Sequence, residues 1–182
     1  MANRPRYIAS ACKALEAILW MAERSKNGFD MYHVVKAMFF ADKWHVARYG
    51  RPIVGDDYKA ATWGPLGQVV YNLLRRQPFE VLALGLNGDP PFKVHMRSFR
   101  VEGERSPNLN WLSETDVEAL EQGYMHVRDK SFEDLVRETH DDPAWSRAAG
   151  GAMDYRDFID DNAEDVDGKR SDIAETAAFT YF

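Results

Sequence analysis

Residues 36–71 read KAMFFADKWHVARYGRPIVGDDYKAATWGPLGQVVY, and this stretch decides the fold. Apolar residues recur at helical spacing up to Tyr49, which predicts a helix. Gly50 follows as the left-handed residue that commonly ends one. Arg51 and Pro52 then predict an extended exit, because proline disfavours helical backbone in the residue before it.

The second half of the stretch turns back on itself. Residues 58–63 are short and rich in Tyr, Thr and Trp, which predicts a small strand. Gly64 and Pro65 come next, and Pro65 suits the first turn of a helix because its missing N–H costs nothing there. No nucleophile, phosphate loop or metal cluster is needed to explain these residues. The stretch therefore has the character of a surface that holds a partner.

Other helices and strands are predicted on both sides of this stretch. Apolar periodicity from residue 8 to residue 22 predicts a first helix, and Asp30 can cap the helix that ends at Gly50. Three prolines and several turn residues predict a loop over 77–91. Alternation over 93–101 predicts a strand that could pair with the strand at 58–63.

The C-terminal half carries three N-cap signals. Ser113 and Ser131 are each followed three residues later by aspartate, and Asp142 precedes a proline. Two more short helices are expected at 154–159 and 171–180. The predicted fold is α+β and mainly α: a single compact helical domain over 1–182 with a small antiparallel β element.

Composition narrows the classes of function. The 182 residues include 29 acidic and 23 basic side chains, which gives a formal net charge of −6. This charge makes a nucleic-acid partner unlikely and would suit a basic protein partner. Hydrophobic residues make up 45%, enough for a core. No apolar run approaches the ~20 residues of a membrane helix, and the single cysteine excludes an internal disulfide. A cytoplasmic protein with no membrane association is expected.

Catalytic and metal sites are weak alternatives. Asp42 and His45 lie three residues apart, whereas the common helical zinc motif pairs ligands four apart. His140 lies beside two aspartates, but acid–base catalysis would also need a cleft and a partner group, so a structural role is favoured. Without a recognisable nucleophile motif, we expect no enzyme, no metal and no cofactor.

Two groups of residues remain as candidates. Asp42 lies on an apolar helix face, where a buried carboxylate needs donors, from backbone or from Arg51. The residues expected to contact a partner flank the Gly-Pro corner: Tyr58, Trp63, Leu66 and Tyr71. The residues expected to be structural are Asp42, Gly50, Arg51, Pro52, Gly64, Pro65, His140 and Trp145.

The central stretch resembles the Panacea antitoxin domain family, also called SocA-like or phage-associated GepA-like. The residues that carry the resemblance are K-x-x-F-F-A-D at 36–42, Y-G-R-P-I at 49–53 and W-G-P at 63–65. Weaker matches follow at 112–114, 131–135 and 139–145. The resemblance covers about residues 11–150 and leaves 151–182 as a C-terminal helical extension.

The resemblance implies an antitoxin that neutralises a cognate protein toxin by direct binding. It implies as an alternative a proteolytic adaptor, which delivers the toxin to an ATP-dependent protease. A DNA-binding autoregulator is a further rival that the acidic composition disfavours. Such a family implies a mainly helical bacterial or phage protein without a catalytic site.

Overall fold

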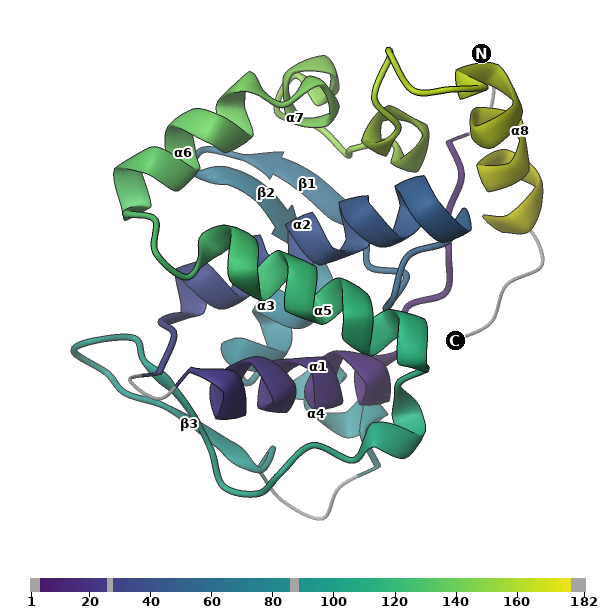
Figure 1. The fold of residues 1–182 in the computed structure, drawn as a ribbon. Coiled ribbons are helices and arrows are strands. Elements are labelled where there is room, and N and C mark those ends of the chain that lie inside the picture. Colours follow the sequence, from purple (N-terminus) through teal and green to yellow (C-terminus); the bar gives the residue numbers. More distant parts are fainter. Residues whose placement is uncertain (1–3, 26–27, 86–88, 178–182) are drawn as a thin grey trace.

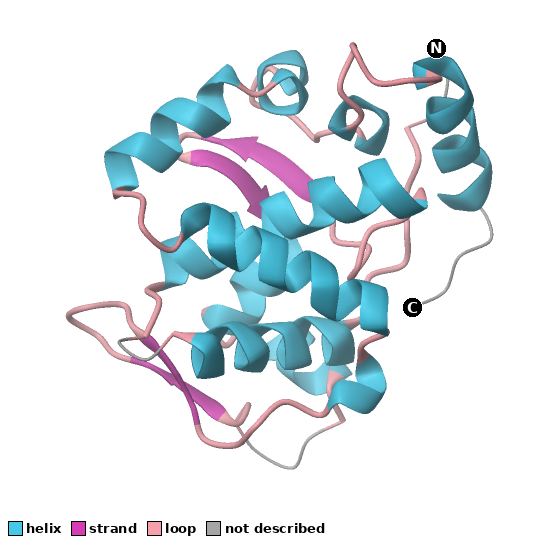
Figure 2. Ribbon diagram, viewed as in Figure 1, coloured by secondary structure: helices cyan, strands magenta, loops and turns pink. Residues whose placement is uncertain are grey.

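The computed structural model describes residues 4–25, 28–85 and 89–177, and its helices far outnumber its strands (Figures 1 and 2). The elements are α1 (Ala11–Arg24), α2 (Met31–Tyr49), β1 (Tyr58–Ala61), β2 (Gly64–Gly67), α3 (Gln68–Leu74), α4 (Pro78–Ala83), β3 (Phe92–Val94), β4 (Val101–Gly103), α5 (Glu114–Val127), α6 (Phe132–Asp141), α7 (Pro143–Ala148) and α8 (Val166–Ala177). Two 3₁₀ turns, η1 (Leu109–Trp111) and η2 (Tyr155–Phe158), complete the order. The predicted α+β, mainly α class is confirmed.

Helix α2 runs through the middle of the molecule and takes part in two cores (Figure 1). Val34 and Met38 pack into the core that α1, α3 and α5 share. Phe39 and Val46 pack into a second core formed by β1, α7, η2 and α8. Because α2 is buried on opposite sides, it links the two halves of the fold.

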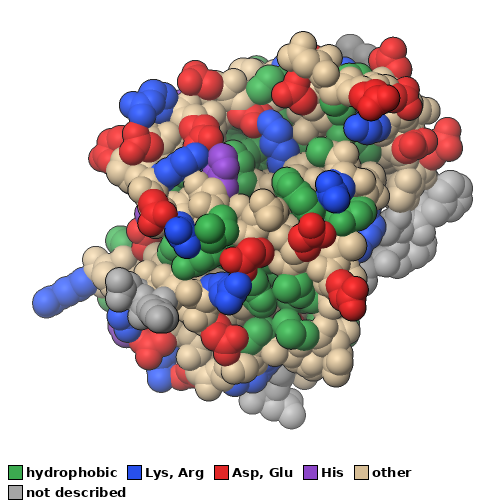
Figure 3. All heavy atoms as spheres, viewed as in Figure 1, with side chains coloured by type: hydrophobic (Ala, Val, Ile, Leu, Met, Phe, Trp, Pro, Cys, Tyr) green, Lys and Arg blue, Asp and Glu red, His purple; other side chains and the backbone are tan. Residues whose placement is uncertain are grey.

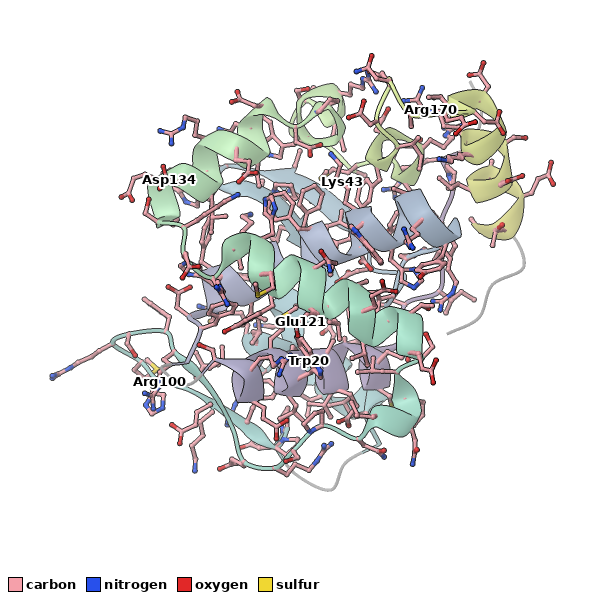
Figure 4. The ribbon with its side chains drawn as sticks, viewed as in Figure 1. Trp20, Lys43, Arg100, Glu121, Asp134 and Arg170 are labelled. Carbon is pink, nitrogen blue, oxygen red and sulfur yellow. The ribbon has the colours of Figure 1, made fainter. Side chains whose placement is uncertain are left out.

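Helices α2 and α5 approach each other closely at Gly123. A Cβ added there would lie 2.2 Å from the Ala37 carbonyl oxygen and 2.9 Å from the Ala41 Cβ. Only glycine lets the two backbones come this near. On the other side of α5, Glu121 lies close to Trp20 of α1 (Figure 4), and its carboxylate pairs with Arg24 at 2.5 Å.

The predicted helix caps are confirmed. Ser113 forms a reciprocal capping box with Asp116, while the Ser131, Asp142 and Asp30 side chains each accept a backbone N–H at the start of their helices. These side chains satisfy donors that a helix cannot satisfy internally. Gly50 ends α2 at φ 71°.

The Gly-Pro corner differs from the prediction. Pro65 lies in β2 opposite Ala60, so it does not begin a helix. Gly64, at φ 96°, supports the tight turn between β1 and β2. The carboxylate of Asp56 decides where α3 begins, since it accepts the N–H groups of Val69 and Val70. Because Asp56 lies well before α3 in the sequence, local residue spacing could not predict this cap.

The segment at 93–101 is also not one strand. It forms part of a separate hairpin, β3 paired with β4, and neither strand pairs with β1 (Figure 2). Phe99, at φ 54°, makes the reversal possible. The predicted loop at 77–91 contains a helix, α4, with Pro78 in its first turn. The prediction of a continuous loop was wrong because Pro and Gly also occur at the ends of short helices.

The C-terminal segment packs on the first hairpin. Ala60 donates to the Gly151 carbonyl and Met153 donates to the Tyr58 carbonyl, both at 2.9 Å. The helix expected at 154–159 is the 3₁₀ turn η2, and that expected at 171–180 is α8, with 178–180 outside the described residues. Residues beyond 150 therefore complete the second core.

The close approach of α2 and α5 predicts that Gly123→Ala destabilises the protein by about 2 kcal/mol, because overpacking outweighs alanine's better helix propensity. Chemical denaturation measures the loss. Gly168→Ala in α8 is the matched control, since the atoms nearest its Cβ belong to the Asp165 side chain. Equal effects of the two substitutions would contradict the packing argument.

Candidate functional site

Asp42 is a fully buried carboxylate that holds the chain after the Gly-Arg-Pro turn. It accepts the Ile53 N–H at 2.6 Å and the Tyr58 hydroxyl at 2.8 Å. Burial raises its pKa to about 6, although these two donors act in the opposite direction. The expected backbone donor is confirmed, but Arg51 is not the side-chain partner.

Arg51 instead pairs with Asp116 at 3.1 Å. Lys13 lies 2.8 Å from the same carboxylate, and His45 Nε2 lies 3.4 Å from it. Burial opposes ionisation of Asp116, yet Lys13 and the Ser113 N–H bring its pKa below the ordinary value. This cluster ties α1, α2 and α5 together and is structural.

His140 and Trp145 hold the β1–β2 turn. Their rings stack at 4.0 Å, with His140 Nε2 3.1 Å from the Thr62 carbonyl and Trp145 Nε1 3.0 Å from the Ala61 carbonyl. A carbonyl only accepts, so His140 carries its proton on Nε2. Both residues therefore support the turn that presents Trp63.

A groove of about 680 Å³ opens beside this turn, and we call it the aromatic groove. The residues that line it come from α2, the β1–β2 turn, α3, the β3–β4 hairpin and α6: Asp30, Met31, Tyr32, Val35, Lys36, Ala61, Thr62, Trp63, Gly64, Leu66, Tyr71, Arg75, Phe99 and Phe132. Phe132 lies 4.4 Å from Tyr32 and 5.7 Å from Trp63, measured between ring centroids.

Lys36 lies at the floor of the aromatic groove, with 1% of the residue exposed. Its Nζ donates to the Pro65 carbonyl at 2.7 Å and lies 4.9 Å from the centre of the Tyr32 ring. Burial lowers the pKa of Lys36 to about 7. Gly64 keeps this space open, because an added Cβ would lie 3.0 Å from Nζ.

The structure brings together three of the four predicted contact residues. Trp63, Leu66 and Tyr71 line the aromatic groove, and Trp63 is 59% exposed. Tyr58 does not: it is 3% exposed, and its hydroxyl is bound to Asp42, so we place it in the core.

Sequence reasoning missed Tyr32, Lys36, Phe99 and Phe132 as groove residues. Tyr32 and Lys36 are spaced four apart on one helix face, which also fits a core, and Lys36 begins the K-x-x-F-F-A-D pattern, which did not indicate a groove. Phe99 and Phe132 reach the groove from a hairpin and a helix far along the chain, so no local pattern could place them there.

The described lining of the aromatic groove consists mainly of apolar and aromatic side chains. Within the described lining there is no His or Cys side chain, and no three His, Cys, Asp or Glu side chains of the described residues converge as metal ligands.

Figure 3 shows Lys, Arg, Asp and Glu side chains interspersed over one face of the molecule. No described helix is long and apolar enough to cross a membrane.

Comparison with known proteins identifies one family. The profile of the family described as "Antitoxin SocA-like, Panacea domain" matches residues 34–146. This range contains most of α2, the elements from β1 to α6 and most of α7, and it includes the groove lining except Asp30, Met31 and Tyr32. No curated protein and no solved structure matches the chain.

Lys36 predicts an unusual dependence of stability on pH. Its pKa is about 7 when folded and about 10.5 when unfolded, so the unfolded chain binds more protons between these values. The buried amine of Lys36 therefore lowers the free energy of unfolding. This destabilisation is complete below pH 7 and decreases as the pH rises toward 10.5. At pH 7 we expect Lys36→Met to be more stable than the wild type by about 2 kcal/mol, after subtracting the lost hydrogen bond.

Denaturation at several pH values measures this difference, which should shrink toward pH 10. Lys59→Met, at an exposed position in β1, is the control and should change stability little at any pH. A Lys36→Met variant that is less stable than the wild type at pH 7 would show that the buried ammonium stabilises the fold.

Asp42 predicts a strong preference for a hydrogen-bonding side chain. Asp42→Ala leaves the Ile53 N–H and the Tyr58 hydroxyl without their acceptor, and we expect a loss of about 3 kcal/mol or more. Asp42→Asn keeps one acceptor and should lose clearly less. If Asp42→Ala unfolds like the wild type in urea but fails to bind a partner, Asp42 has a direct binding role and the structural assignment is wrong.

Proposed function

We propose, because the chain belongs to the Panacea-domain family of SocA-like antitoxins, that it neutralises a protein toxin by binding it directly. The toxin would be the product of a neighbouring gene that stops growth when expressed alone. The proposed contact surface is the aromatic groove. Binding there would cover a toxin surface that the toxin needs for its activity.

The observation that supports this surface best is the exposed set of aromatic rings around the groove. Trp63, Phe99 and Phe132 are 59%, 54% and 39% exposed. Burial of these rings, or polar residues in their place, would have avoided this exposed apolar area. Rigid aromatic side chains give large contact areas at little loss of side-chain entropy, and they dominate the energetics of many interfaces.

The backbone of Phe99 supports the same surface. A φ of 54° is unfavourable for a bulky residue, at about 1 kcal/mol or more. The fold keeps it there: the Phe99 carbonyl accepts the Met31 N–H at 2.9 Å, and the Phe99 N–H is bound to the His95 carbonyl at 2.8 Å. Strain of this kind is common where a residue serves a ligand.

The chain would act in the cytoplasm as a binding protein, without a cofactor or catalytic turnover. The alternative function is that of an adaptor, which holds the toxin in the same groove and delivers it to an ATP-dependent protease. The two functions differ in the fate of the toxin. A toxin lifetime that shortens when this protein is present supports the adaptor, and an unchanged lifetime supports masking.

Trp63→Ala provides the test of the proposed surface. We expect the affinity for the toxin to fall by at least about 2 kcal/mol, because a central exposed tryptophan is lost from the interface. Calorimetry with the purified toxin measures the affinity, and rescue of growth during toxin expression measures the function. The fold should survive, since Trp63 contributes little to either core.

Trp111→Ala is the matched control. Trp111 is 47% exposed in η1 and does not line the groove, so its loss should leave toxin binding unchanged. Equal affinities of the Trp63→Ala variant and the wild type would remove the groove from the interface. Failure of the wild-type protein to rescue growth from the neighbouring gene product would refute the antitoxin function itself.

A further inference from the structure

The aromatic groove contains two cationic side chains, Lys36 and Arg75, that have no anionic partner among the described residues. Lys36 Nζ has one hydrogen-bond acceptor among the described residues, the Pro65 carbonyl, although an ammonium carries three N–H donors. Arg75, exposed at the rim, makes no side-chain hydrogen bond or ion pair within the described part of the chain. Within the described residues, neither side chain therefore has a carboxylate to pair with.

The carboxylate nearest to these cations in the groove lining is already engaged. Asp30 caps α2 by accepting the His33 N–H, and the same oxygen lies 2.9 Å from His33 Nδ1. Burial raises the pKa of Tyr32, so this phenol of the lining carries no negative charge. Within the described residues, Asp30 forms no hydrogen bond or ion pair with Lys36 or Arg75.

We propose that the aromatic groove binds an extended segment of the partner protein whose carboxylate side chain pairs with Lys36, while flanking apolar side chains pack on the aromatic rings. This inference deepens the proposed function by naming the chemistry of the partner. A buried amine in an apolar hollow is unfavourable when alone, and an opposite charge placed beside it removes that penalty. Arg75 attracts the same carboxylate during approach.

Access to Lys36 requires one local movement. The Tyr32 ring lies over Nζ, and its hydroxyl donates to the Trp63 carbonyl at 3.1 Å, at a site open to solvent. Water can replace that hydrogen bond when the ring turns. Tyr32 is half-buried and packs against the first core, so an entering side chain that displaces its ring gives up part of that contact.

A second hollow makes an extended segment the fitting occupant. It measures about 450 Å³ and shares Met31, Arg75 and Phe99 with the aromatic groove. Its remaining lining comes from α3 and the β3–β4 hairpin and includes Met96, which is 89% exposed. A chain in extended conformation passes from one hollow into the other, whereas a single small ligand fills only one.

The net charge of the chain and the local charges of the groove favour opposite kinds of partner. The whole chain carries −6, which favours a basic partner over long distances. At contact distance, however, the unpaired charges of the groove are positive. Local unpaired charge decides which side chain can be buried there, because an unmatched buried charge is costly.

Selection of short random peptides from a displayed library tests the proposal without the toxin. The wild-type protein should enrich peptides with an aspartate or glutamate flanked by apolar residues. In a synthetic copy of an enriched peptide, replacing that acid by its amide should weaken binding about tenfold or more, as expected for a lost charged hydrogen bond. Lys36→Met protein should bind the acid and the amide equally.

Lys59→Met protein is the matched control and should keep the preference for the acid. Enriched peptides without an acidic residue, no enrichment at all, or an acid preference that survives in Lys36→Met would each overturn the proposal. So would self-association of the wild-type protein that Trp63→Ala abolishes, since the groove would then receive a second copy. The peptides report on the groove alone, whereas growth rescue reports on the antitoxin function, so either can fail separately.

Discussion

The structure depends on a buried carboxylate that holds a non-helical segment against a helix. Asp42 projects from α2 and accepts hydrogen bonds from the Ile53 N–H and the Tyr58 hydroxyl. The segment between these residues has no regular structure that could satisfy its own donors, so the carboxylate takes that role. Asp56 then extends the arrangement by capping α3. Two acids thereby fix the path from α2 through the hairpin to α3.

This path determines where the groove lies. Because residues 51–57 are held against α2, the β1–β2 hairpin returns beside the same helix, and the Pro65 carbonyl comes within 2.7 Å of Lys36 Nζ. His140 and Trp145 fasten the turn from the other side. One helix, α2, therefore supplies both the buried acid Asp42 and the amine of Lys36 at the floor of the aromatic groove.

Several locally unfavourable features lie together in the aromatic groove. In the cores, nearly every described buried polar side chain has a hydrogen-bond partner. The groove combines a desolvated ammonium, exposed aromatic rings and Phe99 at positive φ. Proteins commonly accept such local costs where another molecule will offset them. The chain belongs to a family of antitoxins, which implies a protein partner, and the proposed contact of that partner with the groove would account for these features.

The sequence by itself determined the mainly helical class, the caps at Ser113, Ser131 and Asp142, and the end of α2 at Gly50, because these depend on neighbours within one helical turn. It also contained the motifs that indicate the family. Tertiary structure alone decided the pairing of β1 with β2, the partners of Asp42 and Arg51, the burial of Tyr58 and the arrival of Phe99 and Phe132 at the groove. Each of these depends on contacts between residues distant along the chain, and burial and charge pairing at such distances have no periodic signature that a single sequence can display.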